Sequence, residues 1–158
     1  MKMLFILFIT FILFTFSTCN KDDITAPETG TKKLTVTHWG VDWSEGKVGS
    51  EGNEVAYEKS DGETVSWCAY GNSSGSAQGV WFRPYVDKLK KLSVTDLNSV
   101  SLADTTNWLT DVCSSPLQNG DVWLAKCRDG YVVFKVTKQP DPNANFWPVE
   151  VEYKYFKK

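Results

Sequence analysis

Histidine and methionine are almost missing from this sequence of 158 residues, which has one histidine and two methionines. The histidine is His38, and both methionines lie within the first three positions. A site built from several imidazole or thioether groups is therefore excluded. Zinc is not expected either, because one histidine and scattered cysteines offer no close-spaced pair of ligands.

Basic tracts are also missing, apart from a short stretch at residues 88–91. The formal net charge is −2. Nucleic-acid binding needs clustered positive charge, which this composition does not supply. We therefore expect no nucleic-acid partner.

Catalytic motifs are present only in incomplete form. Residues 71–75 (GNSSG) match the G-x-S-x-G pattern of a nucleophile elbow, but that serine needs a histidine from later in the chain, and His38 comes earlier. We expect a surface loop there. Since no carboxylate pair stands out, the sequence predicts a non-enzymatic protein.

A calcium loop is matched only in part after position 140. Asp141, Asn143 and Asn145 have the ligand spacing of an EF-hand, with Glu152 at the twelfth place. Phe146 stands where the sharp turn of such a loop demands glycine. We therefore expect no metal ion and no cofactor.

Long hydrophobic runs are missing too, since the apolar run near the start of the chain covers only 14 residues, at positions 3–16. About 20 residues are needed to cross a bilayer, so a permanent transmembrane helix is not expected. Lys2 before the run and small residues after it are typical of a secretory signal. The sequence predicts a signal peptide at residues 1–18, directly before Cys19.

Residues 16–19 (FSTC) resemble the lipobox of bacterial lipoproteins, in which a signal peptidase cuts before a cysteine that carries diacylglycerol. The alternative is that Cys19 is an ordinary thiol. Residues 20–23 (NKDD) resemble the Lys-Asp-Asp export tag of Bacteroidota lipoproteins, although a solvated linker looks similar. These resemblances imply a lipid-anchored outer-membrane protein at the cell surface, or else at the periplasmic face, with residues 19–31 as a lipidated, disordered tether.

The remaining chain comprises residues 32–158. Alternation of apolar and polar residues predicts one strand at each of its ends. Residues 32–39 form the first strand, with Leu34, Val36 and His38 on one face. Residues 149–156 form the last strand, with one buried face and one wet face.

Two Asp-Gly turns predict hairpins, because Asp-Gly tolerates the positive φ angles of tight turns. In the first, residues 54–59 and 63–70 flank Ser60-Asp61-Gly62; in the second, residues 121–127 and 131–137 flank Arg128-Asp129-Gly130.

The middle of the chain has a weaker pattern. Residues 83–92 favour a helix with Pro84 in its first turn, or else a loop that leads into a short strand near residues 92–100. Residues 105–112 favour a second helix. In sum, we expect an all-β fold: a single β-sandwich or barrel-like domain with little helix.

Three cysteines remain once Cys19 is assigned to the lipid. Oxidising compartments favour one disulfide and one leftover thiol, and the spacing does not choose among the three pairings. The alternative is three buried reduced thiols. The candidates are Cys68, Cys113 and Cys127.

Tryptophan is abundant, with seven residues in the chain. Three lie within apolar alternation and are expected in the core: Trp67, Trp81 and Trp123. Four are flanked by Gly, Pro or polar residues and are candidates for exposed ligand platforms, with packing in the core or against a loop as the alternative: Trp39, Trp43, Trp108 and Trp147.

Three segments resemble a group of small Bacteroidota lipoproteins. Residues 40–47 (GVDWSEGK) resemble their opening Gly-Phe-Asp-Phe-Ser-x-Gly stretch, and residues 120–136 resemble their Gly-x-Val-Tyr … Asp-Gly hairpin. A last strand with alternating tyrosines, residues 151–156, completes the likeness. The best-known relatives are the HmuY-like haem-binding lipoproteins, and the resemblance implies an all-β, surface-exposed protein.

The haem site of that family does not carry over. Its members ligate iron with pairs of histidine or methionine, whereas His38 is alone here and the alternation points it toward the core. We therefore expect no haem. If haem were bound, His38 would supply one axial ligand and a cysteine thiolate the other.

These observations predict a non-enzymatic binding or adhesion module at the cell envelope. Its partners would be the membrane, through the lipid anchor, and a glycan, a small hydrophobic ligand or an envelope protein. The alternatives are a haem-binding lipoprotein that uses His38, a structural subunit of an envelope complex and, last, a hydrolase with two carboxylates facing each other in a deep cleft.

Overall fold

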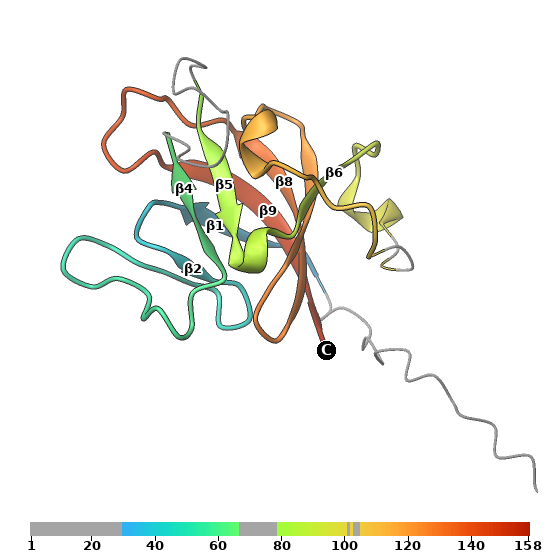
Figure 1. Cartoon of the computed structure of the whole chain (residues 1–158), viewed down its shortest axis with the longest axis horizontal. Helices are drawn as coiled ribbons and strands as arrows, with labels where there is room; N and C mark the ends of the chain where they lie inside the picture. Colours follow the sequence, from blue (N-terminus) through green and yellow to red (C-terminus); the bar gives the residue numbers. More distant parts are fainter. Residues whose placement is uncertain (1–29, 67–78, 101, 103–104) are drawn as a thin grey trace, which may run out of the picture.

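The computed structural model describes residues 30–66, 79–100, 102 and 105–158. Within them, two antiparallel sheets pack across a shared core (Figure 1). The larger sheet has the strand order β1-β9-β8-β7-β6, with β1 Lys32–Val36, β6 Leu89–Leu92, β7 Val122–Lys126, β8 Gly130–Lys138 and β9 Val149–Lys157. The smaller sheet has the order β3-β2-β4-β5, with β2 Val41–Asp42, β3 Lys47–Val48, β4 Gly62–Val65 and β5 Trp81–Pro84. The expected all-β, sandwich-like fold is confirmed.

Aromatic rings from both sheets form the centre of the core. The ring of Trp43 stacks on Phe134 at a centroid distance of 5.6 Å and lies 5.0 Å from Tyr153. Phe82 of the smaller sheet meets Phe134 of the larger sheet at 5.3 Å. Contacts of this kind add to the burial of large apolar surfaces and hold the two sheets together.

The larger sheet is covered on its second face as well. There Leu97, Val133 and Phe156 form a second buried cluster, against which Trp108 packs. Since both faces are covered, β7 is buried almost throughout and shows no alternation. β9 lies between β1 and β8 and keeps its alternation, with Val149, Val151, Tyr153 and Tyr155 buried, as the sequence predicts.

One of the two expected hairpins is present. The turn at residues 127–129 joins β7 to β8, which confirms the second hairpin. The first is wrong, because residues 54–59 form no strand and β4 pairs with β2 and β5 instead. Gly62 has φ 143°, and a Cβ there would lie 2.4 Å from the Arg83 carbonyl oxygen. This glycine therefore permits the close approach of β4 to β5 and does not close a hairpin.

Both expected helices are wrong. Residues 83–92 comprise the end of β5, the 3₁₀ turn η1 (Tyr85–Asp87) and β6, because the chain crosses here from one sheet to the other. Residues 105–111 follow the edge of β6, where the Leu109 amide donates to the Leu89 carbonyl at 2.8 Å. Tertiary pairing overrides the local helical spacing. The other 3₁₀ turns are η2 (Leu97–Ser99) and η3 (Val112–Ser114).

The two described cysteines differ in their oxidation state. Cys113 is disulfide-bonded, whereas Cys127 is a free and fully buried thiol. Three reduced thiols, the alternative, are therefore contradicted. Cys19 and Cys68 lie outside the described residues, as do Trp67, residues 71–75 and the leader.

Helices that could cross a membrane are not found among the described residues.

Candidate functional site

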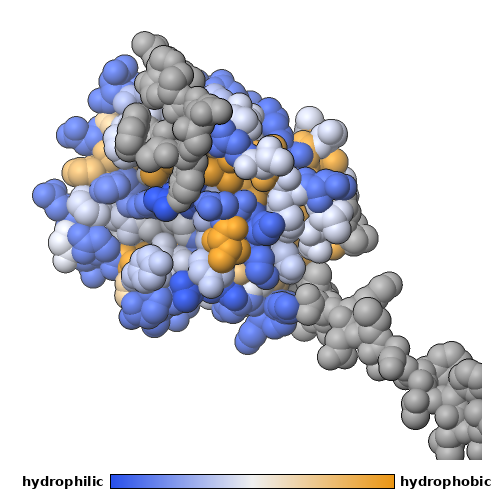
Figure 2. Space-filling view, in the orientation of Figure 1, coloured by the Kyte–Doolittle hydropathy of each residue, from blue (hydrophilic) through white to orange (hydrophobic). Residues whose placement is uncertain are grey.

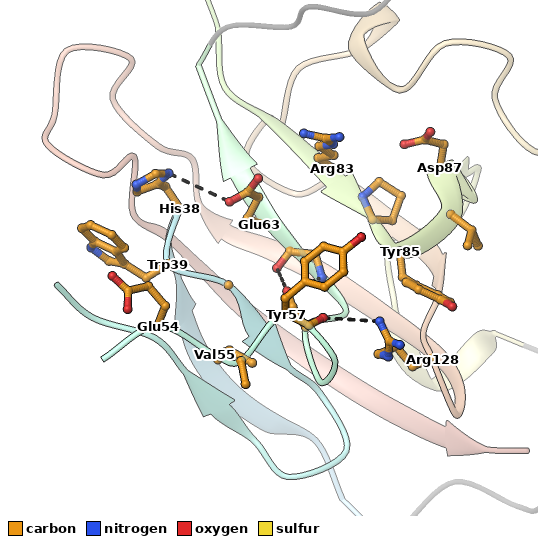
Figure 3. A pocket seen from close by; sticks show the side chains of 16 residues that line it. His38, Trp39, Glu54, Val55, Tyr57, Glu63, Arg83, Tyr85, Asp87 and Arg128 are labelled. Atoms are coloured by element: carbon orange, nitrogen blue, oxygen red, sulfur yellow. Dashed lines mark hydrogen bonds and ion pairs between the residues drawn. The ribbon is translucent and has the colours of Figure 1, made fainter. Parts of the chain in front are cut away.

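An open groove of about 730 Å³ lies over the outer face of the smaller sheet (Figure 3). Along β5, Phe82 points into the core and the next residue, Arg83, points outward into the groove. Glu63 of β4 stands directly opposite Arg83 in the sheet register. Residues 54–57 form one side of the groove and η1 the other.

The first end of the groove is aromatic. His38 and Trp39 follow β1, and their rings lie 4.5 Å apart. The β8–β9 loop brings Phe146 within 5.1 Å of Trp39 and Trp147 within 5.8 Å of His38. The His38 amide donates to the Phe146 carbonyl at 3.1 Å, which joins the two loops.

His38 also faces a carboxylate. Its Nδ1 lies 3.9 Å from Glu63 Oε2, and both side chains are about one-third exposed. The expectation that His38 points into the core is wrong, because β1 ends at Val36 and the alternation ends with it. The imidazole instead lines the groove.

The other end of the groove combines a tyrosine ring and a guanidinium. Arg128, in the β7–β8 turn, lies 4.6 Å from the centre of the Tyr85 ring. Its Nη1 donates to the Tyr57 carbonyl at 3.4 Å. The Tyr57 side chain is 91 % exposed and lies between the two ends (Figure 3).

Backbone strain borders the groove at two places. Val86 and Asp87 in η1 have φ of 52° and 53°, and Phe146 and Trp147 have φ of 63° and 47°. Left-handed backbone costs about 1–3 kcal/mol for each such residue, and a β-branched valine rarely adopts it. The surrounding contacts must hold these residues in place, and such strain is typical of binding loops.

A buried carboxylate supports the Arg128 end from behind. Asp61 is 2 % exposed, and its Oδ1 accepts the Arg128 amide at 2.8 Å while Oδ2 accepts the Trp43 amide at 3.0 Å. Burial raises the pKa of Asp61 to about 6, although the two amide donors oppose the rise.

A second hollow of about 260 Å³ adjoins the groove at Arg128 and is lined by carboxylates, among them Asp42, Glu58 and Asp129. The part of the chain that the structure describes contains no group of three or more side chains placed to hold a metal ion. At the partial calcium motif, Asp141 Oδ1 accepts the Asn143 amide at 2.8 Å, which is an ordinary side-chain turn.

The four candidate platforms do not lie together. Trp39 lines the groove, and Trp147 is half-buried beside His38. The expectation that Trp43 is a surface platform is wrong, because this residue is fully buried at the centre of the core. Trp108 packs on the larger sheet, with its ring 6.4 Å from that of Tyr131, and does not line the groove. The core positions expected for Trp81 and Trp123 are confirmed.

The sequence gives no signal for most of the groove. Tyr57 was expected within a strand, Tyr85 within a helix, and Arg128 as a plain turn residue. All three come together only because the two sheets pack and bring distant loops to one face. The Asp-Gly turn is the one local signal that locates Arg128 at an exposed position.

No family model, no curated protein and no solved structure matches this chain.

Proposed function

We propose that this protein is a non-enzymatic, lipid-anchored protein of the outer membrane, exposed at the cell surface, that binds carbohydrate in the groove over β4 and β5. The observation that carries the proposal is one open groove with both aromatic rings and exposed charged groups in its lining. Trp39, Tyr57 and Tyr85 offer flat apolar faces on which sugar rings can stack. Glu63 and Arg128 offer hydrogen-bond acceptors and donors for hydroxyl groups.

A hydrophobic ligand fits this lining less well than a hydroxyl-rich one. Covering Glu54, Arg83 and Asp87 with apolar surface would remove their hydration without replacing it, which costs free energy. Figure 2 shows the face in front of β4 and β5 as mainly hydrophilic, with hydrophobic side chains in separate small spots. A sugar can replace the lost water through its hydroxyl groups.

The carboxylates of the groove come from three different segments. Figure 3 shows Glu54 near Trp39, Glu63 opposite His38, and Asp87 at the η1 end. In these positions they offer separate hydrogen-bond acceptors for the hydroxyl groups of a bound sugar chain.

The sheet register is consistent with an outward-facing aromatic end. The tether enters at Lys32, which pairs with Tyr153, and β1 ends at Val36 opposite Val149. His38 and Trp39 therefore lie at the far end of β1 from the tether. A tether of residues 19–31 could also hold the domain up to about 40 Å from the bilayer, at roughly 3.3 Å per residue.

A glycan array with matched variants tests the proposal. The unchanged protein is expected to bind a restricted set of glycans, and Trp39→Ala and Tyr57→Ala are expected to weaken that binding at least about tenfold, which is about 1.4 kcal/mol per residue. Trp108→Ala is the control, because this half-buried tryptophan packs outside the groove. Equal loss in all three variants, or no glycan bound at all, would contradict the proposal.

A further inference from the structure

Asp61 joins the two sheets through a single carboxylate. Trp43, whose amide bonds to Oδ2, directly follows β2 of the smaller sheet. Arg128, whose amide bonds to Oδ1, belongs to the β7–β8 turn of the larger sheet. The position of that turn relative to the smaller sheet therefore depends on both oxygens of this side chain.

The same residue lies directly behind the Arg128 end of the groove. The Asp61 carbonyl accepts the Tyr85 amide at 2.8 Å, and the Asp61 amide donates to the Val41 carbonyl at 2.8 Å. Tyr85 and Arg128, the two residues that stack on each other in the groove, are thus each one hydrogen bond away from Asp61.

The electrostatic surroundings of Asp61 oppose its negative charge. Burial removes the water that would stabilise it, and Asp42 from β2 and Asp129 from the β7–β8 turn both repel it. The Cys127 thiol at the end of β7 and the Tyr155 hydroxyl of β9 also interact with it, and burial raises the pKa of both groups. Glu45, Glu58 and Lys59 line the adjoining hollow. With its pKa raised to about 6, Asp61 is ionised at neutral pH and gains a proton in mild acid.

Protonation changes what this carboxyl group can bond. An ionised carboxylate accepts hydrogen bonds at both oxygens, and bonds to a charged acceptor are about twice as strong as neutral ones. After protonation one oxygen carries a hydrogen, so the bonds to the Trp43 and Arg128 amides can no longer both be strong. The turn that carries Arg128 is then held less firmly.

From this geometry we infer that Asp61 is a positioning residue that makes ligand binding in the groove depend on pH: ionised, it fixes the turn that carries Arg128, and protonated, it releases that turn. This inference rests on the proposed function of the groove. If ligand bound only to the ionised form, affinity would fall about tenfold between roughly pH 7.5 and pH 5, the limit for one proton with a midpoint near 6.

The first test needs no ligand. In the purified, ¹⁵N-labelled protein, the amide signals of Arg128 and Trp43 are expected to shift together with one midpoint near pH 6. Asp61→Asn is expected to remove that transition. Asp96→Asn is the matched control, because Asp96 also accepts a backbone amide, that of Asn98 at 2.9 Å, but at an exposed site away from the groove. Loss of the transition in this control, or its persistence in Asp61→Asn, would overturn the inference.

The second test measures binding on the glycan array at about pH 7.5 and about pH 5. The unchanged protein is expected to lose affinity in acid, up to about tenfold, and Asp61→Asn to bind with the same weakened affinity at both values. Because His38 is the only imidazole in the chain and lines the same groove, His38→Gln is the matched variant and is expected to keep the acid-dependent loss. A loss that vanishes in His38→Gln and persists in Asp61→Asn would assign the effect to His38 and overturn the inference.

An additional variant keeps the inference testable if Asp61→Asn does not fold. Arg128→Ala leaves the backbone amide in place and removes only an exposed side chain, so the fold should persist. It is expected to weaken binding at about pH 7.5 and to flatten the pH dependence. In the unchanged protein, strong binding that is independent of pH would refute the coupling alone, whereas no binding at either pH would refute the proposed function and the coupling with it. In Arg128→Ala, an acid-dependent loss as large as that of the unchanged protein would also refute the coupling.

Discussion

The guanidinium of Arg128 stacks on the ring of Tyr85, 4.6 Å from its centre, and joins a turn of the larger sheet to the crossover that leaves the smaller sheet. Arg128 is exposed and Tyr85 is half-buried. Stacked, they present one fixed surface with donors on one side and an aromatic face on the other.

This relationship predicts unequal effects of two substitutions. Arg128→Lys keeps the charge but loses the planar stacking, so glycan binding should weaken about three- to tenfold, while the free energy of unfolding changes by less than about 1 kcal/mol. Isothermal titration with a glycan found on the array, together with urea unfolding, checks both values. Unchanged binding in Arg128→Lys would show that the stacked geometry does not matter.

Replacing two tryptophans that have similar neighbours in the sequence should lower the free energy of unfolding by different amounts. Trp43→Ala removes a fully buried ring and should lower the free energy of unfolding by about 3–5 kcal/mol. Trp39→Ala removes a half-buried ring at the groove and should cost about 1–2 kcal/mol. Chemical unfolding of the two variants gives the comparison, and equal costs would contradict the assigned positions.

These two residues also show which features of the fold a local sequence pattern can predict and which it cannot. The β7–β8 hairpin and β9 could be predicted because alternation and Asp-Gly turn chemistry are local signals. Trp43 could not be placed, since its burial depends on Phe134 and Tyr153 from strands far along the chain. The first Asp-Gly turn misled for a similar reason: Asp61 is buried and bonded across the two sheets, which no local pattern encodes.

Stability should depend on pH through Asp61. A carboxyl group whose pKa is raised by the fold binds its proton more tightly in the folded than in the unfolded chain. Protonation of Asp61 therefore stabilises the fold as a whole, because relief of the buried charge outweighs the weakening of its bonds to the Trp43 and Arg128 amides. This contribution is complete below the unfolded pKa of about 3.9 and is lost as the pH rises through about 6, on the order of 2–3 kcal/mol in all. The difference in unfolding free energy between the unchanged protein and Asp61→Asn should therefore vary between about pH 4 and pH 7. A constant difference over that window would contradict the raised pKa.

Membrane attachment should depend on Cys19. If this residue carries the lipid, Cys19→Ala should move the protein from the membrane fraction to the soluble fraction, because multiple acyl chains supply nearly all of the membrane affinity. Cell fractionation checks the shift, with Cys127→Ala as a cysteine control. Undiminished membrane attachment of Cys19→Ala would refute the lipid anchor.

The most direct measurement of the central claim is a ¹H–¹⁵N chemical-shift map of the protein during titration with a glycan found on the array. Carbohydrate binding in the groove predicts that the largest shifts occur at Trp39, Tyr57, Tyr85 and Arg128, with the Trp108 indole signal unchanged. Largest shifts around Trp108 on the larger sheet, or no saturable shifts at the groove, would contradict it.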